Sequence, residues 1–238
     1  MPFPVTRHPN TAARPRTDDG RVVWYDWRNS NSDIWAMDLT NRTEWSVTSN
    51  PSNQWWPDIG GDFIVWSDTR LDPVAWDIFG YEISTGEEFL ISDANGLQFE
   101  PVTDGNLAAW RDYRTSGNGR DIWAVDLRNL IEFPVVTNPA NQWHPSIDGN
   151  TILWYDDRNG DFDIFGTNIG TGGLGVLGEF LVAGGPGDQT NPNISGGNVV
   201  YLDESTSTSV PEPAGMVLCI CGLVSLMVKL CQKKTFKN

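Results

Sequence analysis

The sequence predicts an all-β fold, a β-propeller built from four-stranded blades, with four complete units and a partial or composite fifth. Three observations predict this class. Sequence landmarks recur about every 44 residues, each period contains four short strand-like segments, and one strand of each period is apolar on both faces. A repeat of this length with four strands per unit is typical of propeller blades.

The strongest landmark is Trp-x-Asp-x-Arg. Its aromatic positions are 42, 44 and 44 residues apart, and a fifth, degenerate copy, Tyr201-Leu202-Asp203, follows after 47 residues. The same carboxylate in every unit indicates a structural role, in which it accepts backbone N–H groups at a strand end and pairs with the Arg, whereas catalysis needs one asymmetric constellation. The four full copies are Trp24, Asp26 and Arg28; Trp66, Asp68 and Arg70; Trp110, Asp112 and Arg114; and Trp154, Asp156 and Arg158.

Two more landmarks keep the same register. Asp-Ile-aromatic recurs once in each complete unit, and each Pro of a Gln-x-x-Pro motif precedes its repeat aromatic by nine residues. Strand-forming residues lie between these landmarks and are bounded by Gly, Asn, Asp and Pro, which favour turns. In the second unit we expect strands over residues 54–59, 63–68, 77–83 and 88–92.

The third strand of each unit predicts how the sheets pack. Alternate residues point to opposite faces of a strand, and here both sets are apolar, so the sheet is covered on both sides. A small residue in mid-strand should let a neighbouring sheet approach closely. Sheets that each pack between two others form a ring. The small residues are Ala36, Gly80, Ala124 and Gly166.

These motifs resemble the TolB-like β-propeller repeats of bacterial envelope and surface proteins, over roughly residues 3–203. The resemblance implies the fold and usually six blades, and it says little about activity. Residues 2–6 look like the fourth strand of a blade, so they either complete a composite fifth blade or remain from a longer chain that has lost upstream units and a signal peptide. We favour the truncated chain, and we place the propeller domain at residues 1–204.

The C-terminal segment is predicted to attach the protein to a membrane. A Ser/Thr linker over residues 205–209 precedes Val210-Pro211-Glu212-Pro213, an apolar helix over residues 214–228 and a lysine-rich end. Residues 210–238 resemble a PEP-CTERM sorting signal, which implies export, processing by an exosortase-type enzyme, and display at the cell envelope or surface. The lysines place the propeller outside the cytoplasm.

Charge and composition narrow the partners. Residues 1–209 contain 12 Arg, no Lys and 30 Asp or Glu residues, a net charge of −18, which repels phosphate backbones and argues against nucleic acid. All three cysteines lie in the tail, and His8 and His144 are the only histidines, so we expect no zinc site. No Gly-x-Ser-x-Gly, P-loop or dinucleotide fingerprint occurs, and the repeated carboxylates indicate structure, so we expect no cofactor and no catalytic residues. One weak Ca²⁺ candidate is the oxygen-rich turn with Asp157, Asn159, Asp161 and Asp163.

We therefore expect a non-enzymatic surface propeller that binds or scaffolds a polysaccharide or an envelope protein. Five aromatic residues in or beside inter-strand loops are the binding-face candidates, because aromatic rings offer large amphipathic contact surfaces. Two alternatives remain open: a hydrolase or lyase acting on extracellular polysaccharide, and a TolB-like periplasmic adaptor. The binding-face candidates are Trp27, Trp55, Trp56, Tyr113 and Trp143.

Overall fold

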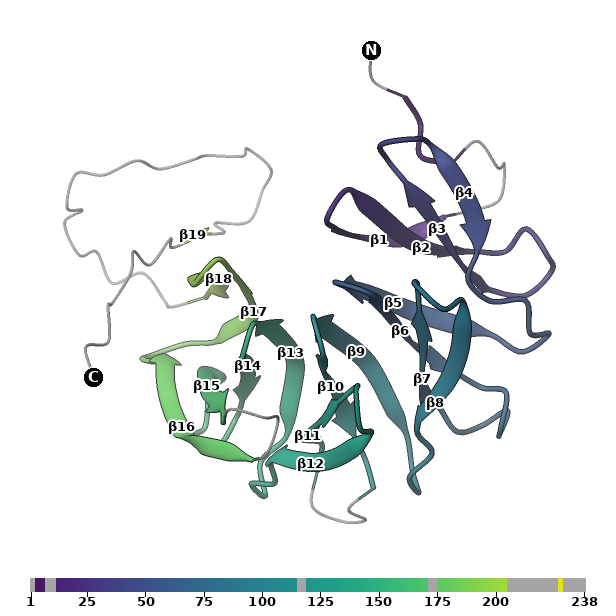
Figure 1. Cartoon of the computed structure of the whole chain (residues 1–238). Helices are drawn as coiled ribbons and strands as arrows, with labels where there is room; N and C mark the ends of the chain where they lie inside the picture. The colour runs from purple at the N-terminus through teal and green to yellow at the C-terminus, as the bar shows by residue number, and fades with distance from the viewer. Residues whose placement is uncertain (1–2, 7–11, 115–118, 171–174, 205–226, 229–238) are drawn as a thin grey trace.

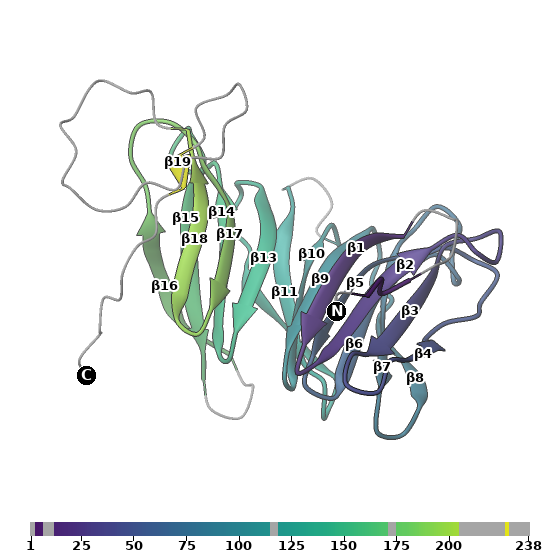
Figure 2. The same ribbon diagram turned by 90° about the horizontal axis from the view of Figure 1, so that it is seen from above.

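The computed structural model describes residues 3–6, 12–114, 119–170, 175–204 and 227–228, and this part of the chain is built of antiparallel sheets. Four sheets have four strands each, in chain order from the inner to the outer strand. The sheets form a fan with its first strands on the inner side (Figure 1), which Figure 2 shows from above. The predicted propeller architecture is confirmed for these four units.

The first two sheets contain strands β1 to β8. The first is formed by β1 (Ala13–Asp18), β2 (Arg21–Asp26), β3 (Asp33–Asp38) and β4 (Thr43–Ser46). The second is formed by β5 (Gln54–Gly60), β6 (Phe63–Asp68), β7 (Asp77–Glu82) and β8 (Glu87–Ser92). Each predicted strand of the second unit is present, with ends that differ by one residue at most.

The third and fourth sheets repeat this plan, and a smaller fifth sheet follows. The third is formed by β9 (Gln98–Asp104), β10 (Leu107–Asp112), β11 (Asp121–Asp126) and β12 (Ile131–Val136). The fourth is formed by β13 (Gln142–Asp148), β14 (Thr151–Asp156), β15 (Asp163–Ile169) and β16 (Val176–Ala183). The fifth pairs β17 (Gln189–Ser195) with β18 (Asn198–Asp203), and a two-residue strand, β19 (Met227–Val228), adds to β18.

The hydrophobic core lies between successive sheets, as the two-sided apolar strands predict. Trp66 packs among residues of the first sheet, Trp110 among those of the second and Trp154 among those of the third. Tyr201, the degenerate fifth copy, packs against the fourth sheet in the same way. From the second sheet onward the repeat aromatic therefore packs against the preceding sheet, and full burial of such a ring contributes about 1.5–3 kcal/mol.

The first sheet has no preceding sheet in the described chain, and Phe3 and Val5 pack against its outer face beside Trp24. The guanidinium of Arg42 lies 4.2 Å from the Phe3 ring centroid. Residues 3–6 form no strand, and the fifth sheet does not include them. The composite fifth blade is thus not what the structure has, because these residues cover the exposed apolar face of the first sheet instead.

The two mid-strand glycines serve a purpose different from the predicted one. A Cβ atom at Gly80 would lie 2.6 Å from the Phe89 ring, and one at Gly166 would lie 2.6 Å from Leu153. Phe89 and Leu153 belong to the same sheets as these glycines, so the space admits side chains of adjacent strands rather than a neighbouring sheet. The close approach of two sheets occurs at Gly60, where a Cβ would lie 2.7 Å from the Thr103 carbonyl oxygen.

Candidate functional site

The Trp-x-Asp-x-Arg motif forms the same hydrogen-bonded unit in all four complete sheets, and we call this unit the staple. In the third sheet, Trp110 Nε1 donates to Asp112 Oδ2 at 2.8 Å and the Arg114 backbone N–H donates to Oδ1 at 2.7 Å. The Arg114 guanidinium pairs with the same carboxylate at 2.8 Å. The other three copies repeat these contacts, with indole-to-carboxylate distances of 3.1, 2.9 and 3.1 Å for Trp24, Trp66 and Trp154.

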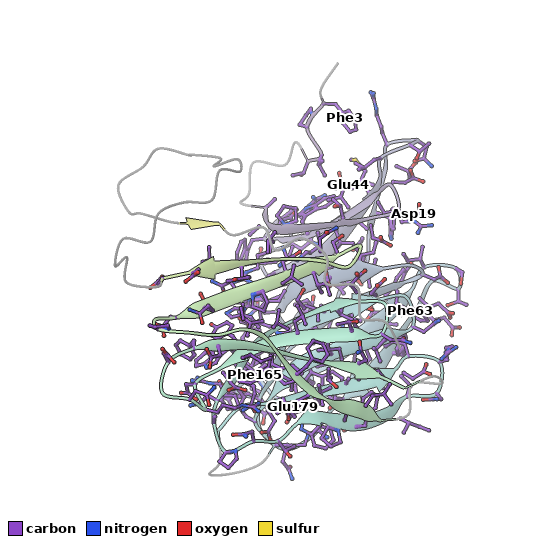
Figure 3. All side chains as sticks on the ribbon, turned by 90° about the vertical axis from the view of Figure 1, so that its left-hand side faces the viewer. Phe3, Asp19, Glu44, Phe63, Phe165 and Glu179 are labelled. Atoms are coloured by element: carbon purple, nitrogen blue, oxygen red, sulfur yellow. The ribbon has the colours of Figure 1, made fainter. Side chains whose placement is uncertain are left out.

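Each staple also reaches the two outer strands of its sheet. The Arg guanidinium stacks on an aromatic ring of the third strand and pairs with a Glu of the fourth. In the fourth sheet Arg158 lies 4.0 Å from the Phe165 ring centroid and 2.6 Å from Glu179, and both of these residues are labelled in Figure 3. The Asp is fully buried, so the staple ties all but the inner strand together through one charge network.

Electrostatics agree with a structural role for the carboxylate of the first staple. Burial alone would raise the pKa of Asp26, but the hydrogen bonds from Arg28 and Trp24 hold that pKa below its usual value. The carboxylate is therefore ionised at neutral pH with its acceptor positions filled. None of the four Asp side chains lines the cavity described below.

The inner strands carry a feature that the sequence did not predict. In the four Gln-x-x-Pro motifs, and in Ala12-Ala13-Arg14-Pro15 of the first sheet, the residue before the proline has a positive φ between 46° and 57° and lies in an interruption of the strand register. Non-glycine residues rarely adopt such angles, and each costs on the order of 1 kcal/mol or more. These five pre-proline residues are Arg14, Trp56, Glu100, His144 and Asn191.

The buried glutamine of the same motif fixes this geometry. The Gln142 side-chain amide donates to the Ala140 carbonyl at 2.6 Å, and its backbone N–H donates to the Arg120 carbonyl of the third sheet at 2.8 Å. The backbone N–H groups of Gln54, Gln98 and Gln189 bond to the preceding sheet in the same way. The inner strand is thus held on its neighbour just before the register interruption.

Four of the five pre-proline residues line one cavity between the inner strands of the first four sheets. Its volume is about 70 Å³, enough for a few water molecules or for one carboxylate-sized group. Proline and valine form the rest of its apolar wall. The cavity is lined by Arg14, Arg16, Trp56, Pro57, Glu100, Pro101, Val102, His144 and Pro145.

The five aromatic binding-face candidates come together beside this cavity. The Trp27 and Trp55 ring centroids are 6.4 Å apart, and those of Trp55 and Trp56 are 5.7 Å apart. Arg120 joins the other two candidates, because its guanidinium lies 5.4 Å from the Tyr113 centroid and 3.5 Å from the Trp143 centroid.

Further rings, which sequence reasoning missed, make this array continuous. Phe99 lies 5.8 Å from Trp56 and 5.3 Å from Tyr113, and Trp76 lies 4.8 Å from Trp56. The sequence did contain a signal for the array, because most of its aromatic residues occupy the variable positions of the Trp-x-Asp-x-Arg and Gln-x-x-Pro motifs. We call the whole set the aromatic belt: Tyr25, Trp27, Trp55, Trp56, Trp76, Phe99, Tyr113, Trp143, Tyr155 and Phe162.

A charged cluster connects the cavity and the belt. Glu100 Oε2 lies 3.4 Å from Arg111 Nη1 and 3.4 Å from His144 Nδ1. Arg111 is buried, and its guanidinium stacks 4.0 Å from the Phe99 centroid and 4.9 Å from that of Trp143. Arg111 Nε and Glu100 Oε2 have no hydrogen-bond partner within the described residues. Burial lowers the pKa of His144, against the opposing effect of Glu100, so the imidazole is neutral at pH 7.

Asp58 follows the cavity-lining Pro57. Burial raises its pKa to about 6, although its Oδ2 accepts the Thr103 N–H at 2.9 Å and Arg16 lies 3.7 Å away. This carboxylate is therefore mostly ionised at pH 7, where it offsets part of the Arg16 charge, and it loses its own charge as the pH falls through 6. Arg14 and Arg16 nevertheless place two cations in the wall of the cavity on a strongly acidic protein.

The proposed calcium turn consists of side chains that bond within the fold. Asn159 donates to Asp163 at 2.6 Å, as Asn29 does to Asp33 in the first sheet at 2.7 Å. Asp161 accepts the Gly187 N–H at 3.0 Å, and Asp157 accepts the Asn141 N–H at 3.1 Å. Across the described part of the chain, no three His, Cys, Asp or Glu side chains are grouped so as to hold a metal ion.

The sorting motif Val210–Pro213 and His8 lie outside the described residues, as does most of the predicted helix over residues 214–228. The last two residues of that segment are described, and they form β19. Within the ranges that the structure describes, no helix has the length and apolar character needed to cross a membrane.

Comparison with solved structures places this fold. The chain superposes on TolB from Acinetobacter baumannii with a TM-score of 0.61 and 17% identity, covering 84% of this chain and 51% of that one. The putative TolB from Agrobacterium tumefaciens gives a TM-score of 0.53 and 17% identity, over 73% and 66% of the two chains.

The fold is a TolB-like β-propeller. The β-propeller domain of the Trilobed protease from Pyrococcus furiosus, described as having an open velcro topology, is also similar, with a TM-score of 0.51 and 14% identity over 83% and 78% of the two chains. No protein-family model and no curated protein matches the sequence. The chain spans about two thirds or less of the length of the two TolB structures. At identities this low, the similarity establishes the fold alone.

Proposed function

We propose that this chain is a non-enzymatic binding propeller that holds an extracellular polysaccharide along the inner ends of its sheets. The observation that carries the proposal is the aromatic belt, which runs from Trp27 in the first sheet to Tyr155 in the fourth beside a cavity. Aromatic faces stack on the apolar faces of sugar rings, and a polymer can contact several of them in succession.

The partial exposure of the belt supports this role. Trp27, Trp55, Trp56, Trp76 and Trp143 are half-buried, whereas the repeat tryptophans of the staples are almost fully buried. The β6–β7 loop that carries Trp76 also exposes Leu71 and Val74. An apolar surface that remains accessible beside polar groups is typical of a binding surface.

The tail supplies the cellular part of the proposal. Its Val-Pro-Glu-Pro motif, apolar segment and lysine-rich end favour export, exosortase-type processing and envelope attachment, with the propeller outside the cytoplasm. Cell fractionation of the full chain and of a chain ending at Glu204 tests this. We expect the full chain with the envelope and the shorter chain in the soluble fraction, and equal soluble fractions would contradict the attachment.

Binding itself is tested by affinity electrophoresis of the propeller in gels that contain purified neutral and acidic polysaccharides. We expect retardation by at least one polymer, and weaker retardation for Trp56→Ala. The matched control is Trp45→Ala, because Trp45 is also half-buried but lies on β4, an outer strand. Retardation by none of the polymers, or equal retardation of both variants, would contradict the proposal. Release of reducing ends from the polymer would favour the hydrolase alternative.

A further inference from the structure

At the pre-proline position of the inner strand, the side chain differs from one repeat unit to the next. The proline after it and its backbone angle recur in all five sheets, and the glutamine two residues before it recurs in four, but the side chain is Arg, Trp, Glu, His or Asn. Four of these five side chains line the same cavity. The fold therefore holds four different functional groups at equivalent positions around one small space.

Each of these side chains is retained at a backbone angle that glycine adopts at lower cost. Glycine would relieve the strain at Arg14, Glu100 and His144, yet charged or titratable groups occupy these positions. Strained non-glycine residues cluster where a side chain is needed at a fixed place. This argues that the cavity recognises a ligand, and that these residues select it.

The arginines indicate the charge of that ligand. Of the eleven arginines in the described ranges, five pair with an Asp two positions earlier in the chain. Of the other six, four lie at the cavity or the belt, so a strongly acidic protein concentrates its remaining cations at one place. These four are Arg14, Arg16, Arg111 and Arg120.

Arg111 is the sharpest of these signals. Its side chain is 8% exposed, its contact with Glu100 is 3.4 Å long, and its Nε lacks a hydrogen-bond partner in the described structure. Arg111 is not in the cavity wall and adjoins the cavity through Glu100, so its charge offsets that carboxylate and favours an anion beside Arg14 and Arg16. A carboxylate has the planar geometry that suits guanidinium groups and a single charge, whereas a doubly charged phosphate would meet stronger repulsion from Glu100.

The size of the cavity indicates how the carboxylate is attached. At about 70 Å³ the cavity accepts the charged group but not a sugar ring, which would remain at the rim against Trp56. Glu100 as an acceptor and the neutral His144 as a donor and acceptor suit hydroxyl groups beside the carboxylate. A hexuronic acid combines these features: a ring with an apolar face, hydroxyls and one carboxylate.

We infer that the cavity is the subsite for a uronic acid unit of the polysaccharide, an inference that rests on the proposed polysaccharide-binding function. Arg14 and Arg16 in the cavity wall bind its carboxylate, Arg111 offsets the charge of Glu100 beside it, Glu100 and His144 bind its hydroxyls, and Trp56 carries its ring.

The test compares polygalacturonate with its fully methyl-esterified form, in EDTA, by affinity electrophoresis and calorimetry. We expect the ester to bind at least ten-fold more weakly, and Arg111→Gln to lose about ten-fold affinity for the acid but not for the ester. His144→Gly and Arg14→Gly should weaken binding while shifting Tm by less than about 4 °C. Leu130→Gly, at a positive φ on an outer turn, is the matched control that should leave binding unchanged.

The outcomes separate the two proposals. Equal binding of acid and ester, or tighter binding of dextran sulfate than of polygalacturonate, would overturn the uronate subsite while the binding function stands. An Arg111→Gln variant with full affinity and unchanged Tm would overturn it as well. Binding of an acidic peptide in place of every polysaccharide would overturn both proposals.

Discussion

Two sets of equivalent residues in the same sheets behave in opposite ways. The staples use the same Trp, Asp and Arg in all four complete units, and their contacts are the same to within a few tenths of an ångström. The pre-proline residues share one backbone conformation but never a side chain. The comparison teaches that positions with the same residue in every unit maintain the fold. Positions that share a backbone conformation but differ in side chain provide the functional groups.

The largest effect should come from breaking a staple. In Asp112→Ala the Arg114 charge and the Trp110 N–H lose their buried acceptor, so the free energy of unfolding should fall by about 3–5 kcal/mol. Chemical denaturation measures this change. Glu87→Ala, at an exposed position of β8, is the control and should change stability by less than about 0.5 kcal/mol. A loss below about 1 kcal/mol in Asp112→Ala would remove the structural role assigned to the repeat.

Two arginines only three residues apart sharpen the comparison. Arg114→Met leaves the buried Asp112 unpaired and should cost about 3 kcal/mol, whereas Arg111→Met replaces a poorly bonded cation among aromatic rings and should cost less than about 1 kcal/mol. Thermal denaturation of the two variants under the same conditions measures the difference. Equal losses would mean that Arg111 is as structural as the staple arginines.

The pH dependence of stability separates buried carboxylates of the two regions. Because the pKa of Asp58 is raised to about 6, the folded state holds its proton more tightly than the unfolded state does between about pH 4 and pH 6. Its contribution to stability is therefore present below pH 4 and is lost as pH rises through 6, by up to about 3 kcal/mol.

Asp58→Asn keeps an acceptor for the Thr103 N–H and should gain stability relative to the wild type as pH rises from 4 to 7. The contribution of Asp26 to stability should change with pH in the opposite direction, because its pKa is lowered in the folded state and its contribution is lost as pH falls. Denaturation curves at pH 4, 5, 6 and 7 measure both. A constant difference between Asp58→Asn and the wild type would contradict the assignment.

The smallest effects should come from the strained positions. Glycine removes the cost of the positive φ at His144 or Leu130 but makes the unfolded chain more flexible, so each change should lie within about 1 kcal/mol of zero. Thermal melts of both variants measure it. A loss above about 2 kcal/mol in His144→Gly would mean that this side chain serves the fold rather than a ligand.

Much of the fold could be predicted because its signals are local and repeated. The spacing of Trp24, Trp66, Trp110 and Trp154 predicted the four sheets. The third strands, which are apolar on both faces, predicted that each sheet packs between two others. The role of Gly80 was wrong, because the sequence does not say whether a small residue faces another sheet or the Phe89 ring of its own sheet. The composite blade was wrong because Phe3 and Val5 found an apolar face on the first sheet.

The candidate site could be predicted only in part. Five aromatic residues of the belt were chosen from their places in loops and inner strands, and the structure brings them together. The cavity was missed, because a residue before proline normally takes an extended φ, and nothing in the sequence indicates a positive value at Glu100 or His144. Arg111 was missed because only the packed structure reveals a guanidinium that lies among aromatic rings with unfilled donors.

Side-chain footprinting by hydroxyl radicals, with and without polygalacturonate, tests most directly whether the varied inner positions are the binding site. The account predicts that the ligand reduces oxidation of Trp56 and Trp143, while Trp45 on the outer strand β4 is oxidised to the same extent. Protection of Trp45 with unchanged oxidation of Trp56 and Trp143 would contradict it.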